Sequence, residues 1–308
     1  MEGKLTVRVP AEQMAKLEEA AYQIRRLSLE MITYAKWGHP GGSLSMAEIL
    51  SVLYFHTMNI DAEKPDRKDR DRLILSKAHA SPALYAALAL KGFIPIEKIY
   101  TYCEPGGLEG HTDRTHTPGI EASGGPLGMG LSVAVGCAYG LRLKENPQSR
   151  VFCILGDGEL NEGNIWEAAM SAAHFHLDNL IVIVDYNKVM AKGFVWDLMN
   201  IEPLVDKWNA FGWDILEVDG HDIEALCDTF YQARWVKPRG KPLVIIAHTV
   251  KGRGVEIAEF NYKWHTHAPE PEIADQMLRA LSRRYFRPEL GYSRLDDVRE
   301  KETFYGGE

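Results

Sequence analysis

Short apolar runs alternate along the chain with longer amphipathic stretches. Runs with the length and aliphatic content of buried parallel strands occur at 73–75, 151–155, 180–184, 213–218 and 242–247. Helical spacing of apolar residues is found between these runs, at 82–91, 129–144, 162–175, 203–211 and 222–236. This alternation predicts an α/β fold with a mostly parallel sheet and helices on both faces.

The pattern before the first run predicts two helices and a loop. Apolar residues recur at helical spacing over 11–36, and Gly and Pro in WGHPGG (37–42) are expected to stop this helix. A second helix is expected over 46–56. The charged segment 61–72 contains Pro, which is typical of a solvated surface loop.

The C-terminal part is expected to contain one more helix, over 270–285, and then a loosely structured tail over 287–308. The sequence contains no internal repeat and no low-complexity linker. We therefore expect one domain that covers 1–308.

Charge and hydropathy restrict the partners. The net charge is −8, from 35 Lys and Arg against 43 Asp and Glu, whereas nucleic-acid binding needs a basic face. No apolar run reaches the roughly 18 residues that a membrane span needs. The N-terminus lacks the apolar core of a signal peptide. These features predict a cytoplasmic protein that binds neither nucleic acid nor membrane.

Polar residues follow four of the predicted strands. They are Ser76-Lys77-Ala78-His79, Gly156-Asp157-Gly158, Asp185-Tyr186-Asn187 and Lys251. Ligands of parallel sheets bind where the carboxyl ends of the strands lead into helices. The sequence therefore predicts a ligand site at this edge.

The segment VFCILGDGELNEGNIWE (151–167) points to the ligand. Its glycines allow close approach of a ligand, and a single Asp157 suits Mg²⁺, which takes most of its oxygens from water and phosphate. Asn187, at the end of the next strand, offers an amide oxygen, and the Val189 carbonyl could complete the protein ligands. This pattern favours a Mg²⁺-bridged diphosphate. The alternative is a Gly-Asp-Gly turn that only caps a helix.

Several motifs occur in the order found in transketolases. They are GHPGGSLS (38–45), LSKAHASPALYAAL (75–88), LEGHTD (108–113), GGPLGMGLSVAVG (124–136), GDGELNEGNIWEAAMSAAH (156–174), VDYNK (184–188), VKGRG (250–254) and KWH (263–265). Nearly the whole chain thus resembles the N-terminal half of a transketolase, a thiamine diphosphate-binding fold.

The resemblance implies roles for particular residues. Asp157, Asn187 and Val189 resemble the ligands of Mg²⁺, or of another divalent cation such as Ca²⁺ or Mn²⁺. Glu162 and Glu167 resemble acids that link active sites across a subunit contact. The histidines expected around the reactive carbon and the donor hydroxyls are His39, His79, His111 and His265. The residues expected to contact the cofactor are His79, Gly125, Pro126, Leu127, Asp157, Gly158, Glu159, Asn187, Lys251 and His265; we expect Glu159 to act through its backbone.

In the mechanism that the resemblance implies, a two-carbon ketol group passes from a ketose to an aldose. A glutamate needed to activate the cofactor lies in a second, pyrimidine-binding domain, and this sequence ends at Glu308 before such a domain. We therefore expect one subunit of a split transketolase, with a C-terminal subunit that supplies this glutamate and contacts to the anionic end of the sugar. An α₂β₂ assembly is expected.

Some positions depart from the family pattern, namely Thr112, Thr266, His267 and Lys192. The sugar could therefore be an unusual one, sulfonated or branched. His56, His116 and His221 match no motif. The alternatives are the α subunit of a 2-oxoacid or acetoin dehydrogenase, a fragment similar to 1-deoxyxylulose-5-phosphate synthase, and a non-catalytic scaffold with this fold.

Overall fold

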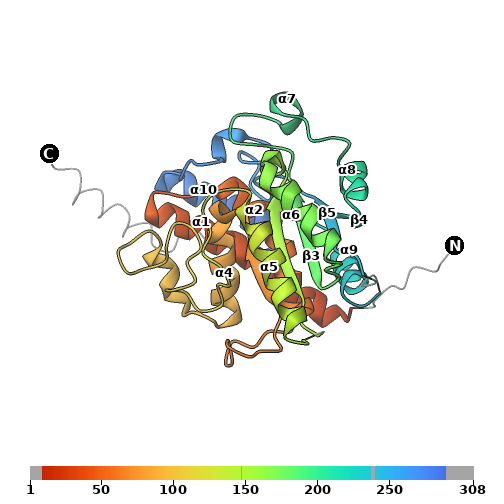
Figure 1. Cartoon of the computed structure of the whole chain (residues 1–308). Helices are drawn as coiled ribbons and strands as arrows, with labels where there is room; N and C mark the ends of the chain where they lie inside the picture. The colour runs from red at the N-terminus through yellow and green to blue at the C-terminus, as the bar shows by residue number, and fades with distance from the viewer. Residues whose placement is uncertain (1–8, 147, 237–239, 289–308) are drawn as a thin grey trace.

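Five parallel strands form one sheet in the computed structural model, which describes residues 9–146, 148–236 and 240–288 (Figure 1). The order across the sheet is β1-β2-β3-β5-β4, and each neighbouring pair is parallel. The strands are β1 Arg72–Leu75, β2 Val151–Gly156, β3 Leu180–Tyr186, β4 Asp214–Asp219 and β5 Leu243–His248. All the predicted strands are present, with ends shifted by at most about two residues, the usual uncertainty of such boundaries.

Helices cover both faces of the sheet, as predicted. Because side chains alternate along a strand, Leu75 and Ile154 point to one face, whereas Ile74 and Cys153 point to the other. The helices on the first face are α1 Ala11–Ala35, α3 Ala47–Val52, α4 Ser81–Lys91 and α9 Ile223–Tyr231. The helices on the second face, two of them side by side in Figure 1, are α5 Met129–Leu143, α6 Gly163–His174 and α8 Leu204–Ala210.

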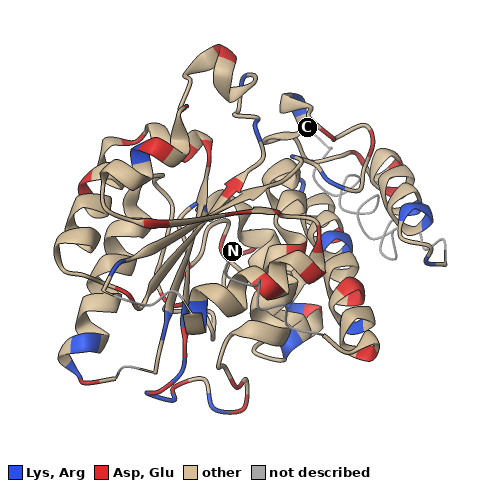
Figure 2. Cartoon of the chain, turned by 90° about the vertical axis from the view of Figure 1, so that its right-hand side faces the viewer, with Lys and Arg blue, Asp and Glu red and all other residues tan. Residues whose placement is uncertain are grey.

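The remaining described elements are short or peripheral. Helix α10 Pro271–Arg284 packs on α1, and its Met277 and Leu281 belong to one buried apolar cluster with Tyr22 and Leu29. The short elements are α7 Val195–Leu198, 3₁₀ turns Ala78–Ala80, Ile96–Thr101, Gly158–Asn161 and Tyr262–Trp264, and π turns Leu53–Thr57 and Gln232–Val236. Within the described ranges, no helix combines the length and apolar character that crossing a membrane requires. Figure 2 shows Lys and Arg interspersed with Asp and Glu.

The structure corrects two local predictions. Helix α1 ends at Ala35, just before the WGHPGG segment, with Lys36 as its left-handed cap. Pro40 of that segment then begins a second helix, α2 Pro40–Ser45, because Pro fits the first turn, where no N–H is needed. The segment 61–72 is not wholly solvated, because Asp71 is fully buried and pairs with Arg234 at 2.5 Å. The tail predicted over 287–308 lies, from residue 289 on, outside the described residues.

Candidate active site

Asp185 is the buried centre of the carboxyl edge of the sheet. Its carboxylate, at the end of β3, pairs with Lys77, which follows β1, and both side chains are essentially inaccessible to water. It also accepts hydrogen bonds from Ser45 Oγ at 2.6 Å, Asn187 Nδ2 at 2.9 Å and Thr249 Oγ1. A buried carboxylate needs such a set of partners. Asp185 therefore joins three strand ends and α2.

Three oxygens of the kind that Mg²⁺ prefers lie beside Asp185. Asp157 Oδ1 accepts from Gly158 N at 2.7 Å, and its Oδ2 accepts from Lys188 N, so backbone groups fix the carboxylate. The amide nitrogen of Asn187 donates a hydrogen bond to Asp185. The Oδ1 atom of Asn187 therefore points away from Asp185 and accepts a hydrogen bond from Val189 N at 3.2 Å. The third oxygen is the Val189 carbonyl. Carboxylate, amide and carbonyl oxygens fit a hard divalent cation.

Lys251 reaches the Val189 carbonyl from the loop after β5. Its Nζ donates to Val189 O at 2.6 Å and lies 2.8 Å from His265 Nδ1. This approach requires glycine on the neighbouring helix α2. A Cβ atom on Gly41 would lie 2.9 Å from Trp264 O and 3.0 Å from Lys251 Cε, which is too close for an ordinary contact.

The predicted histidines form one cluster. The ring centroids of His39, His79 and His265 lie 5.1–5.5 Å from one another, and the ring of His111 lies 6.4 Å from that of His39. Trp37 contacts the rings of His39 and His111 edge-on. His39 Nδ1 is buried and has no hydrogen-bond partner within the described part of the chain. A buried polar atom without a partner indicates a place for a ligand.

Burial keeps these imidazoles neutral. It lowers the pKa of His39 to about 4 and that of His265 to about 3, with nearby His111 and Lys251 adding smaller effects. Burial also lowers the pKa values of His79 and His111. At pH 7 each ring therefore has one nitrogen that donates a hydrogen bond and one that accepts.

Burial also shifts the pKa values of Asp157 and Lys251. Burial, and next the charge of Asp185, raise the pKa of Asp157. Burial lowers the pKa of Lys251 although Asp157 opposes this effect. A nearby cation would favour the charged form of Asp157, and a nearby diphosphate would favour the charged form of Lys251.

The acids of 151–167 do not form one cluster. Asp157 and Glu159 are buried, whereas Glu162 and Glu167 are exposed on this chain. The Glu159 carboxylate accepts from Ser76 Oγ at 2.5 Å, Gly128 N at 2.8 Å and Gly156 N at 3.0 Å. It therefore ties the Gly-Asp-Gly turn to the segment before α5 through its side chain, which the sequence did not suggest.

A cavity of about 120 Å³ brings most of the predicted cofactor residues together. The predicted residues that line it are His79, Leu127, Asp157, Gly158, Glu159, Asn187, Val189, Lys251 and His265. Gly125 and Pro126 lie just outside this lining, on the segment that leads to Leu127. Thr112 is buried, and its carbonyl accepts from Gly124 N at 2.9 Å, whereas Lys192, Thr266 and His267 are exposed.

Comparison with known proteins identifies the class of protein to which this fold belongs. A family described as "Transketolase, thiamine diphosphate binding domain" matches residues 17–285. A solved transketolase from Campylobacter jejuni superposes with a TM-score of 0.82 at 30% identity over 93% of this chain, which spans 45% of that chain. The protein therefore contains a thiamine diphosphate-binding domain of an α/β enzyme.

More particularly, the chain belongs to the transketolase family and forms part of a split transketolase-type transferase. A 6-deoxy-6-sulfo-D-fructose transketolase subunit from Clostridium sp. (strain MSTE9) is 46% identical over 81% of this chain and 90% of its own length. An apulose-4-phosphate transketolase subunit from Phocaeicola vulgatus is 38% identical over 88% of this chain and 96% of its own length. The resemblance seen in the sequence is thus confirmed.

Sequence reasoning gave no individual role to the buried residues that hold the site together. Lys77 and Asp185 lie inside family motifs but receive no role from the sequence, and Glu48 and His221 carry no local signal at all. A signal for Asp185 was present, since an acid directly after the apolar run LIVIV falls at the buried end of a strand. Its partners come from distant segments, which no local pattern indicates.

Proposed function

We propose that this chain is the cofactor-binding subunit of a two-chain transketolase that transfers a two-carbon ketol group from a ketose with an anionic end to an aldose. The observation that carries the proposal is the meeting of oxygens suited to a divalent cation with four neutral imidazoles at one edge of the sheet. Relatives named as transketolase subunits, matched over at least nine-tenths of their lengths, support a separate partner chain.

Asp157, Asn187 and the Val189 carbonyl would hold Mg²⁺, or Ca²⁺ or Mn²⁺ in its place. Gly158, His79, Lys251 and His265 would contact the diphosphate, and Gly125, Pro126 and Leu127 would pack beside the aminopyrimidine. The buried charge of Lys251 supports this role, since desolvated ammonium and phosphate attract strongly. Bound thiamine diphosphate would supply the carbanion chemistry that breaks a carbon–carbon bond next to a ketose carbonyl.

The histidines would bind the sugar through hydrogen bonds. A neutral imidazole can accept a hydrogen bond from a hydroxyl with one ring nitrogen and donate one to a carbonyl oxygen with the other. His39 offers a free Nδ1 for such a contact, while Nδ1 of His265 is taken by Lys251, which leaves the Nε2–H of His265 as a donor. His79 lies beside His265, and His111 lies beside His39.

A partner chain would complete the site. Cofactor pockets usually enclose at least about 300 Å³, whereas the cavity here is about 120 Å³. A second surface is therefore needed, and we propose that a C-terminal subunit provides it together with the catalytic glutamate. Glu162 and Glu167, exposed near and on α6, would lie at a contact between two copies in an α₂β₂ assembly.

The donor is proposed to carry a terminal sulfonate or phosphate, because the relatives above are named for a sulfonated and a phosphorylated sugar. The test is ketol transfer from 6-deoxy-6-sulfo-D-fructose and from apulose 4-phosphate, with Mg²⁺ and thiamine diphosphate, by this chain with and without the C-terminal subunit. We expect turnover only with both chains, loss of turnover and of cofactor affinity in Asp157→Ala, and no change in Asp206→Ala, an exposed acid on α8. Full turnover by this chain alone, or by Asp157→Ala, would contradict the proposal.

A further inference from the structure

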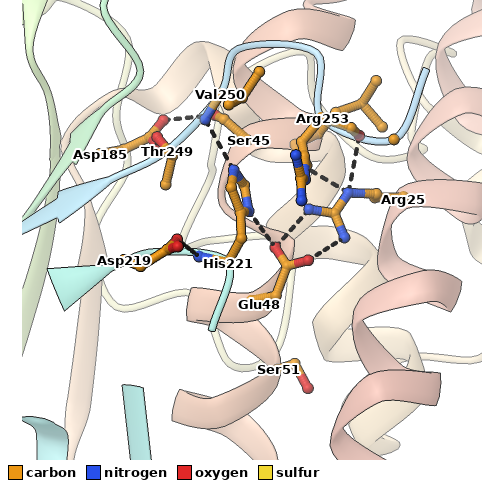
Figure 3. A network of polar contacts seen from close by, with 12 residues as sticks. Arg25, Ser45, Glu48, Ser51, Asp185, Asp219, His221, Thr249, Val250 and Arg253 are labelled. Atoms are coloured by element: carbon orange, nitrogen blue, oxygen red, sulfur yellow. Dashed lines mark hydrogen bonds and ion pairs between the residues drawn. The ribbon is translucent and has the colours of Figure 1, made fainter. Parts of the chain in front are cut away.

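A buried series of polar contacts lies behind the Lys251 loop (Figure 3). Arg25 of α1 donates its two terminal nitrogens to Glu48 of α3, at 2.6 and 2.5 Å. Glu48 Oε2 lies 3.0 Å from Nδ1 of His221, which follows β4. His221 Nε2 lies 2.9 Å from Val250 N. The contacts therefore run from α1 through α3 to the backbone next to Lys251.

The partners of His221 fix its tautomer. A backbone N–H can only donate, so Nε2 of His221 accepts from Val250. Nδ1 then carries the proton and donates to Glu48. The side chain is 8% exposed, and its two nitrogens are both used. His221 in this arrangement is neutral and cannot be replaced by a residue that only donates.

The loop is held on both sides of Lys251. His221 binds the N–H of Val250, and Arg25 Nε donates to the carbonyl of Arg253 at 3.0 Å. Between these points Gly252 N donates to Gly41 O at 3.0 Å. The Lys251 side chain leaves the loop toward the cavity, where it contacts Val189 O and His265. A shift of the loop would therefore move the ammonium away from the site.

We propose that His221 is a positioning residue for the cofactor: by accepting the Val250 N–H it fixes the loop that places Lys251 in the cavity. The inference rests on the proposed contact between Lys251 and the diphosphate. His221 does not line that cavity, so its effect must pass through the backbone of the loop. Preorganisation of a binding group lowers the cost of ordering it when the ligand binds.

Two substitutions separate the contacts of His221. The amide of His221→Asn lies near the position of Nδ1 and can donate to Glu48, but it leaves Val250 N without an acceptor. The amide of His221→Gln reaches the position of Nε2 and can present its oxygen to Val250. His248→Asn is the control, because His248 also contacts a carboxylate, Glu217, near this loop, but on the exposed side.

The first measurement is hydrogen exchange of backbone amides 249–255 in the cofactor-free protein. We expect exchange about tenfold faster in His221→Asn, the size expected when one hydrogen bond is lost, and rates close to wild type in His221→Gln and His248→Asn. The second is affinity for thiamine diphosphate with Mg²⁺ in the complex with the partner subunit. We expect about five- to tenfold weaker binding in His221→Asn, with kcat at saturating cofactor within about twofold of wild type.

The inference would be overturned if hydrogen exchange were unchanged in His221→Asn, or if the Asn and Gln variants lost cofactor affinity equally. If residue 221 only filled space, its replacement by Asn and by Gln would have the same effect. Lys251→Met separates the remaining possibilities. If it binds the cofactor weakly while His221→Asn binds normally, the positioning role is wrong. If Lys251→Met binds as wild type does, the proposed contact of Lys251 fails, and the inference fails with it for that separate reason.

Discussion

Glu48 provides a test of how much a buried charge contributes to the stability of this fold. Its carboxylate lies between α1 and α3, is buried, and pairs with Arg25 through both oxygens. Burial opposes its charge, but Arg25 and then His221 outweigh burial, and the pKa of Glu48 falls from 4.5 to about 2. Glu48→Gln keeps the shape, removes the charge and leaves Arg25 buried without a counter-charge.

The pKa difference sets the size and the sign of the effect. At about 1.4 kcal/mol per pKa unit, the ionised carboxylate stabilises the fold by about 3 kcal/mol at pH 7. Because the folded pKa is lowered, this stabilisation is complete above pH 4.5 and is lost as the pH falls towards about 2. The difference in unfolding free energy between wild type and Glu48→Gln should therefore shrink by about 2 kcal/mol between pH 7 and pH 3.

Urea unfolding followed by tryptophan fluorescence at pH 7, 5, 4 and 3 measures this difference. Glu217→Gln is the matched control, since Glu217 also pairs with a histidine but is 52% exposed, and such surface pairs contribute at most about 1 kcal/mol. A loss below about 1 kcal/mol at pH 7 in Glu48→Gln would refute the reasoning. A larger loss that does not change with pH would assign the effect to packing instead of charge.

Three further predictions concern the site. Gly41→Ala should weaken thiamine diphosphate binding about tenfold in calorimetry, as an overpacked contact costs about 1–3 kcal/mol, whereas Gly136→Ala, with nothing within 4 Å of its Cβ, should not. Lys77→Met leaves Asp185 buried without its cation and should lower the unfolding free energy by about 3–5 kcal/mol; a loss under about 1 kcal/mol would show that the hydroxyl donors suffice. His39 should titrate near pH 4 in NMR spectra of the imidazole carbons, and a midpoint above about 6 would mean that its ring is not shielded from water.

The strands and their mostly parallel character could be predicted because their signals are local. Parallel strands buried on both faces are continuous aliphatic runs, and LIVIV and PLVIIA are found as β3 and β5. The same pattern predicted which edge of the sheet carries the site, because polar residues come directly after these runs. The motif order then identified the family before any geometry was known, and the family match confirms it.

Contacts between distant segments could not be predicted in this way. Pro40 starts a helix although α1 has already ended at Ala35, and a Pro in sequence fits either the end or the start of a helix. Asp71, in a segment rich in exposed charges, is buried because Arg234 reaches it across 163 positions. His221 lies alone in its segment, and only the approach of α3 and of the loop after β5 gives its two nitrogens their partners.

The buried residues that hold the site are different from the exposed positions that depart from the family pattern. Asp185, Lys77, Glu159 and Glu48 are buried and form their hydrogen bonds within this chain, so the geometry of the region proposed for the cation and diphosphate is set when the chain folds. The positions that depart from the family pattern and are exposed, Lys192, Thr266 and His267, form no part of this framework. Substitution there should leave the affinity for thiamine diphosphate unchanged in calorimetry, because no buried charge or hydrogen bond among the described residues depends on them.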